Sequence, residues 1–173
     1  VAARHKAQEL GIPVVPGSDE PLPNVDAAVT RAGDIGFPII LKASYGGGGR
    51  GMRVCRNDND VRTFFEQASP DAAAAFGHGD IFMEKYVESP KHIEVQVLGD
   101  GYGNVVHLYE RDCSIQRRHQ KVVEIAPSPR LDAGLRDQLC ADAVRLAKAS
   151  GYVNAGTVEF LVDAKGAHYF IEM

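Results

Sequence analysis

The sequence feature that most constrains the fold is a run of four glycines, residues 46–49, between two apolar segments. The segments on either side, residues 37–42 and 52–55, have the apolar composition of short strands. Glycines lack a Cβ, so their backbone N–H groups can lie directly against an anion. We therefore interpret this region as a strand, a phosphate-binding lid and a second strand.

Cations flank the glycine run. Lys42 precedes it, and Arg50 and Arg53 lie in and after it, where a polyphosphate would need positive charge. The glycines also satisfy the G-x-G-x-x-G pattern of dinucleotide-binding folds, but there the pattern opens a helix, whereas residues 52–55 predict a strand. No Gly-Lys-Ser/Thr closes the loop as in a Walker A motif. The remaining alternative is a disordered surface loop.

Three segments are expected along the chain. Residues 1–13 predict a helix that we interpret as a linker remnant. Residues 14–87 alternate helix and strand patterns, as in a small α/β lobe, and Asn24 is the candidate N-cap of a helix in it. From residue 88, apolar residues recur with period two, as in Ile93, Val95 and Val97, which is typical of antiparallel strands. We interpret residues 88–173 as the truncated first part of a larger lobe.

Composition narrows the possible partners. The formal net charge of −4 argues against general nucleic-acid binding, and no apolar stretch is long enough to span a membrane. The 3 cysteines are too few and too scattered for a disulfide framework or a zinc site, which indicates a reducing compartment.

The last two expected strands carry a candidate metal site. If residues 163–166 form a tight turn, Glu159 lies opposite Phe170, and Glu172 lies two residues further on the same face. Two neighbouring carboxylates on a partly buried face favour a divalent cation, so we expect magnesium there. The alternative is a pair of solvated glutamates.

Two further stretches are rich in polar groups. Residues 111–121 form a basic cluster in which Gln116 and Gln120 separate the cations, which suits a small oxyanion better than a nucleic acid. Glu84 and Lys85 end an apolar strand whose backbone could bind adenine, although an exposed ion pair is equally compatible. We expect Cys113 to fill space in the core.

Together these stretches resemble the biotin carboxylase domain of biotin-dependent carboxylases, which has the ATP-grasp fold. The resemblance covers the whole chain and rests on residues 42–54, 83–87, 92–97, 110–124 and 156–161. Within the family, residues 74–77, 107–111 and 123–127 are most similar to the pyruvate carboxylase branch. The fold implied is α+β, with a small α/β lid lobe and part of a larger, mainly antiparallel lobe.

The resemblance implies that ATP phosphorylates bicarbonate, and that the carboxyphosphate formed carboxylates biotin on a separate carrier domain. The cofactors implied are ATP, Mg²⁺ or Mn²⁺, and biotin. The residues implied in metal binding are Glu159 and Glu172, and the residue implied in bicarbonate binding and catalysis is Lys121. The residues implied in ATP binding are Lys42, Gly46, Gly47, Gly48, Gly49, Gly51, Met52, Glu84, Lys85, Val87, His92, Gln116 and His119.

The family has further functional residues that this sequence lacks. A metal-binding Asn, an Arg and a catalytic Glu would follow Met173, and an ATP-binding Lys would precede Val1. We therefore expect this stretch to be inactive without the rest of its chain. The complete protein is expected to be a homo-oligomer in the cytoplasm or the mitochondrial matrix. Rival interpretations are an acyl-CoA carboxylase, another ATP-grasp ligase such as carbamoyl phosphate synthetase, and a non-catalytic nucleotide-binding module.

Overall fold

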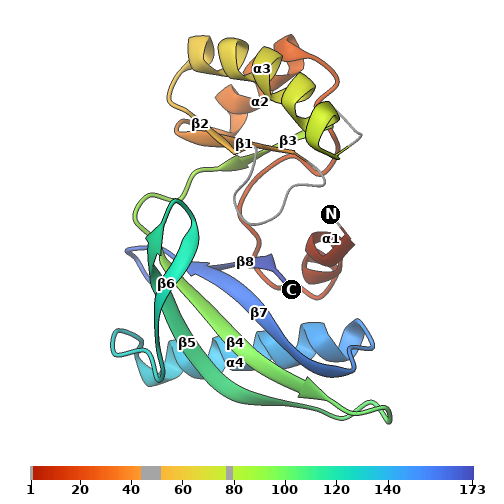
Figure 1. The fold of residues 1–173 in the computed structure, drawn as a ribbon, viewed down its shortest axis with the longest axis vertical. Coiled ribbons are helices and arrows are strands. Elements are labelled where there is room, and N and C mark those ends of the chain that lie inside the picture. The colour runs from red at the N-terminus through yellow and green to blue at the C-terminus, as the bar shows by residue number, and fades with distance from the viewer. Residues whose placement is uncertain (1, 44–51, 77–79) are drawn as a thin grey trace. The chain divides into compact units, whose positions relative to one another are not determined.

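The computed structural model describes residues 2–43, 52–76 and 80–173 (Figure 1). They form two compact units, one of residues 15–86 and the other of the segment before residue 15 together with residues 87–173. The glycines at positions 46–49 and 51, expected to bind phosphate, lie outside the described residues. No helix in the described ranges is long and apolar enough to cross a membrane.

The unit of residues 15–86 packs two helices on a three-stranded antiparallel sheet. The helices are α2 (Val25–Ile35) and α3 (Asp58–Phe76), and the strand order is β2 (Arg53–Cys55), β1 (Ile39–Ala43) and β3 (Ile81–Lys85). As the sequence predicts, Asn24 caps α2, and its side chain accepts a hydrogen bond from the Ala27 backbone N at 2.9 Å.

Residues 16–18, here called the Gly17 strap, run along the outer edge of β3. The Ser18 N donates to Met83 O at 2.8 Å, and the Lys85 N donates to Pro16 O at 2.7 Å. The Ser18 hydroxyl accepts from the Met83 N at 3.0 Å. At Gly17 the approach is so close that a Cβ would lie 2.4 Å from Met83 O. Only glycine fits this position without displacing the strap.

The other unit contains a five-stranded antiparallel sheet with one helix, α4 (Ala133–Ala149), on one face (Figure 1). Each strand in the order of the sheet pairs antiparallel with its neighbours. The strands, in sheet order, are β6 (Gln120–Ile125), β5 (Val105–Arg117), β4 (Lys91–Gly99), β7 (Asn154–Val162) and β8 (His168–Glu172).

The core of this unit lies between the sheet and α4. Ile93, Val95 and Val97 are fully buried there, which confirms the expected period-two pattern of β4. The first helix, α1 (Ala2–Glu9), belongs to the same core because its Ala7 is buried there, as is Ile12 just after the helix. The helix that the sequence suggested as a linker remnant is therefore a packed element of this unit.

Charged residues also face α4. Glu110 on β5 is 1% exposed, and its Oε1 accepts a hydrogen bond from Arg136 Nε of α4 at 2.8 Å. The Ser128 backbone N donates to the same oxygen at 3.0 Å. The ion pair fixes β5 to the helix that covers it.

The hairpin of β5 and β6 contains the basic cluster of residues 111–121. The polar block after residue 110 continues β5 to Arg117, and Arg118 and His119 form the turn to β6. Both turn residues have positive φ, 51° and 66°. A two-residue hairpin turn often requires positive φ, and glycine or asparagine normally occupies such positions. Because the turn here consists of an arginine and a histidine, the sequence gives no signal for it.

Candidate functional site

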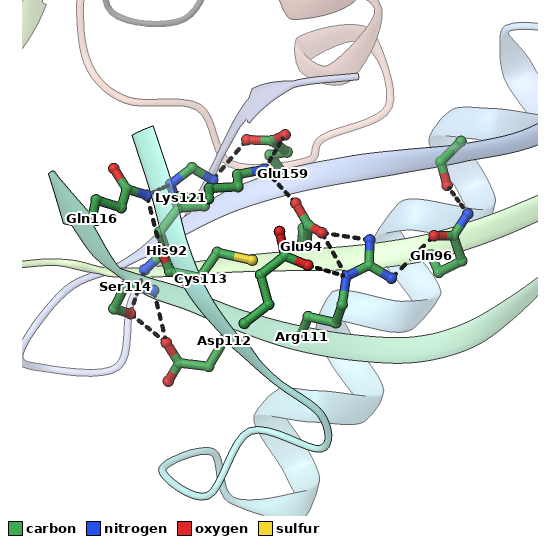
Figure 2. Close-up of polar contacts among 12 residues, drawn as sticks. His92, Glu94, Gln96, Arg111, Asp112, Cys113, Ser114, Gln116, Lys121 and Glu159 are labelled. Carbon is green, nitrogen blue, oxygen red and sulfur yellow. Dashed lines mark hydrogen bonds and ion pairs between the residues drawn. The ribbon is translucent and has the colours of Figure 1, made fainter. Parts of the chain in front are cut away.

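The sheet face opposite α4 carries a row of charged side chains (Figure 2). Glu159 on β7 lies directly opposite Glu94 on β4, and Glu94 lies directly opposite Arg111 on β5. Since Ile93 and Val95 point to the α4 core, the residue between them must point to the other face. The antiparallel register therefore brings two carboxylates and a guanidinium side by side.

Lys121 on β6 bridges the two carboxylates. Its Nζ donates to Glu159 Oε1 at 2.7 Å and also binds Glu94 Oε2. Burial alone would lower the pKa of Lys121, but the hydrogen bonds to Glu159 and Glu94 outweigh it and raise that pKa. Lys121 is therefore a permanent cation, and its side chain is still 27% exposed.

His92 binds the other oxygen of Glu159. Its Nε2 lies 2.6 Å from Glu159 Oε2, and Gln116 Nε2 lies 2.7 Å from its Nδ1. The Gln116 amide nitrogen also donates to the carbonyl of Cys113 at 2.9 Å. An amide nitrogen can only donate, so His92 Nδ1 accepts and its proton sits on Nε2, which donates to Glu159.

These contacts keep Glu159 ionised. Burial alone would raise the pKa of its carboxyl, but hydrogen bonds from His92 and Lys121 outweigh burial and lower that pKa to about 2. Thus four residues that the sequence suggested for ATP, metal and bicarbonate binding share one network: His92, Gln116, Lys121 and Glu159. Their separate roles stay predictions.

The register of the last hairpin differs from the sequence expectation. Glu159 lies directly opposite Glu172, not Phe170, and the register shifts between Glu159 and Phe160. The turn closes with the Asp163 N donating to Ala167 O at 2.9 Å, one residue later than a turn ending at residue 166. The two glutamates are nevertheless neighbours on adjacent strands. Paired carboxylate oxygens fit the ligands that magnesium prefers, so the suggested metal site stays a prediction.

A second group of potential ligand atoms suits magnesium less well. One atom each of Glu94, Cys113 and Glu124 lies within 4.8 Å of the other two. Both oxygens of Glu94 bind cations, but both oxygens of Glu159 are engaged by Lys121 and His92 in the same way, so this does not distinguish the two groups. The difference is the buried Cys113 thiol, whose pKa is raised to about 12 by burial and then by the charge of Glu94, because magnesium prefers oxygen ligands.

The unit of residues 15–86 holds Lys42, Met52, Glu84 and Lys85, four of the residues predicted to bind ATP, and Val87 is the first residue after it. Lys42 on β1 forms an ion pair with Glu84 on β3, the residues' side chains being 32% and 17% exposed. Lys85 Nζ donates to the carbonyls of Gly36, at 2.9 Å, and Phe37, at 2.7 Å. Met52 directly precedes β2 and is half-buried, and Val87 follows β3 by two residues. The side chain and backbone N of Lys85 are thus both engaged within this unit.

His119, suggested for ATP binding, is exposed in the β5–β6 turn, and its role stays a prediction. Another part of the site was not anticipated from the sequence. Glu94 and Arg111 received no role from the sequence, yet they form the centre of the row. The outward position of Glu94 follows from period two along β4, but its pairing with Arg111 depends on a register that shifts between Val95 and Val97.

The chain matches the family model described as carbamoyl-phosphate synthase L chain, ATP binding domain, over residues 1–173. It is 59% identical to the mitochondrial pyruvate carboxylase of Mus musculus over 173 residues, which is 100% of this chain. The chain spans about 15% of the length of the curated relatives it matches.

Solved structures match closely too. A biotin carboxylase complex with β,γ-ATP from Campylobacter jejuni has a TM-score of 0.96 and 53% identity, covering 99% of this chain and 38% of that one. The biotin carboxylase domain dimer of Hydrogenobacter thermophilus 2-oxoglutarate carboxylase, in complex with MgADP, ADP and bicarbonate, has a TM-score of 0.94 and 54% identity over the same fractions. The expected α+β, ATP-grasp architecture is confirmed.

Proposed function

Because this chain belongs to the family of carbamoyl-phosphate synthase L chain ATP-binding domains, we propose that it forms part of a biotin carboxylase that uses ATP and bicarbonate. The observation that carries the proposal is the position of Lys121. It is a partly exposed cation held between Glu94 and Glu159, with His92 and Gln116 beside it. Such a preorganised cation suits a small oxyanion better than a large one.

Lys121 would bind bicarbonate and stabilise the negative charge that develops during phosphoryl transfer. An oxygen of bicarbonate attacks the γ-phosphorus of ATP, the bond to the bridging oxygen breaks, and ADP leaves with its electron pair. Carboxyphosphate is the product. Catalysis of this type depends on positioning and charge neutralisation.

Other residues would hold the nucleotide and its metal. Lys42 is partly exposed on β1, a few residues before the glycine segment in the sequence, so we assign it to the phosphates of ATP. Glu84, Lys85 and Val87 are assigned to adenine. Glu159 and Glu172 would hold Mg²⁺, which supplies positive charge to the phosphate oxygens when bound.

For the whole protein, we propose pyruvate as the final carboxyl acceptor, reached through biotin on a carrier domain. The support is the 59% identity with a pyruvate carboxylase. The 54% identity with a 2-oxoglutarate carboxylase domain favours a second acceptor, 2-oxoglutarate. We also propose a homo-oligomer, located in the cytoplasm or in the mitochondrial matrix, because the relatives include a biotin carboxylase dimer, a bacterial enzyme and a mitochondrial one.

The test is ATP cleavage by the complete protein with and without bicarbonate and biotin. We expect cleavage to require both, and Lys121→Met to lower its rate at least 100-fold, as when one donor to a developing oxyanion is removed. Lys165→Met makes the same chemical change at an exposed turn and should leave the rate within about twofold.

The rival interpretations give different results in this assay. Bicarbonate-dependent cleavage without biotin would point to another ATP-grasp ligase. Nucleotide binding with no bicarbonate-dependent cleavage would point to a non-catalytic module. Titration of this chain with MgATP, with Lys42→Ala and Glu159→Gln/Glu172→Gln variants alongside, tests the nucleotide and metal assignments separately.

A further inference from the structure

Glu94 is held by a cation on each of its oxygens. Lys121 Nζ binds Oε2, and on the other side Arg111 Nε donates to Oε1 at 2.6 Å (Figure 2). The Glu94 side chain is only 4% exposed, so water contributes little to stabilising its charge. Burial alone would raise the pKa of Glu94, but the hydrogen bonds from Lys121 and Arg111 outweigh it and lower that pKa.

Arg111 is itself fixed in place. Its Nη1 donates to Gln96 Oε1 at 3.0 Å, and Gln96 Nε2 donates in turn to the Gly156 carbonyl of β7 at 2.8 Å. Glu124 Oε2 lies 3.5 Å from Arg111 Nε. The guanidinium therefore binds acceptors on β4 and also lies beside a carboxylate on β6, which a planar fork of donors can do and a single ammonium cannot.

Among Glu94, Glu159, Lys121 and Arg111 the charges cancel only if Arg111 is counted, while Glu124, which is 46% exposed beside Arg111, adds a negative charge that solvent screens. Glu94 and Glu159 contribute two negative charges, and Lys121 contributes one positive charge that both of them share. Without Arg111, the buried carboxylate of Glu94 would be compensated by Lys121 alone. An anion approaching Lys121 would then meet a net negative cluster at short range, where partial burial weakens solvent screening.

We propose that Arg111 is a positioning residue for the oxyanion site at Lys121. By holding Oε1 of Glu94, it leaves the charge of Lys121 available to incoming bicarbonate. This inference rests on the proposed function, because it takes bicarbonate as the anion that Lys121 binds. Arg111 touches no reacting atom and acts through Glu94.

The first test measures bicarbonate kinetics in the complete protein. Arg111→Met should raise the KM for bicarbonate about tenfold or more while changing the KM for MgATP less than about twofold, because binding of the anion alone is weakened. Arg111→Lys keeps the positive charge but loses the forked guanidinium, so its KM for bicarbonate should lie between the values of the wild type and of Arg111→Met. Arg145→Met on α4, where the residue is 51% exposed beside Asp142, is the matched control and should leave both constants near wild type.

The second test needs no activity. The rate at which Lys121 is reductively methylated, read by mass spectrometry of the folded protein, reports how tightly its ammonium is paired. We expect this rate to fall at least threefold in Arg111→Met, because Glu94 then has Lys121 as its only cationic partner in the row and pairs with it more tightly. Lys165 in the same sample is the internal reference.

The outcomes separate the two proposals. Unchanged bicarbonate KM and unchanged Lys121 methylation in folded Arg111→Met would overturn the positioning role, and so would equal losses for bicarbonate and MgATP. If Arg111→Met does not fold, Gln96→Leu removes one acceptor of the fork and should give the same effects in weaker form. If wild-type protein shows no bicarbonate-dependent ATP cleavage, the proposed function fails, while the methylation rates still test the coupling of Arg111 to Lys121.

Discussion

Replacing Gly17 by alanine should destabilise the unit of residues 15–86 strongly. The new Cβ would lie 2.4 Å from Met83 O and 2.9 Å from Glu84 Cγ, distances that packed atoms do not tolerate. One of the two contacts is backbone, so the Gly17 strap must move away from β3. The separation would break the hydrogen bonds from Ser18 N to Met83 O and from Lys85 N to Pro16 O.

The magnitude follows from the bonds lost. Two backbone hydrogen bonds and the buried one between Met83 N and the Ser18 hydroxyl contribute about 1 kcal/mol each. We therefore expect Gly17→Ala to lower the free energy of unfolding by about 3 kcal/mol, with overpacking adding to this value if the strap resists displacement. A loss of this size corresponds to a fall in Tm of roughly 12–24 °C for a unit as short as residues 15–86.

Urea unfolding followed by circular dichroism measures the loss, and Gly33→Ala is the matched control. Gly33 lies inside α2, and a Cβ there meets nothing within 4 Å, so alanine should stabilise the helix by about 0.5–1 kcal/mol. A Gly17→Ala variant within about 1 kcal/mol of wild type would show that the strap is not pinned to β3, and the reasoning would be wrong.

Three further changes test other contacts. Glu159→Gln should cost about 3 kcal/mol at pH 7 and little near pH 2, measured by urea unfolding at each pH. The folded pKa of about 2 lies below the unfolded value of 4.5, so this stability is complete above pH 4.5 and is lost as pH falls through 2. Asn24→Ala removes the cap of α2 and should cost about 1 kcal/mol in the same assay, whereas Asn59→Ala, exposed in α3, should change stability by under about 0.5 kcal/mol. Leu139→Ala empties a fully buried position of α4 and should lower the unfolding free energy by about 2–5 kcal/mol, against under about 0.5 kcal/mol for Leu108→Ala, where the side chain is 60% exposed.

The sequence predicted those features of the fold that depend on residues close together in the chain. The alternation along β4 identified Ile93, Val95 and Val97 as its buried face, and they are fully buried. Asn24 was the expected cap of α2, and it makes the capping bond. In both cases the signal lies within a few residues of the chain, because side-chain direction and capping depend on near neighbours.

Features that depend on distant strands could not be predicted in this way. The partner of Glu159 is Glu172 and not Phe170 because the last turn is one residue longer than expected and the register shifts by one more residue between Glu159 and Phe160. The pairing of Glu94 with Arg111 lies beyond a register irregularity that no local pattern marks. A register is fixed by the whole sheet, so sequence identified members of the site but not the row that joins them.

The two faces of β5 carry side chains of opposite charge, each paired with a partner of the other sign. Arg111 needs Glu94 on one face, while Glu110 needs Arg136 of α4 on the other. A slip of one residue would exchange the faces, setting Glu110 beside Glu94 and Arg111 beside Arg136. Both misalignments would place like charges in contact, which is unfavourable between neighbouring strands. The charges on the two faces of β5 therefore disfavour any pairing shifted by one residue. We expect insertions and deletions within β5 to be tolerated far less than those in the turn at residues 100–104.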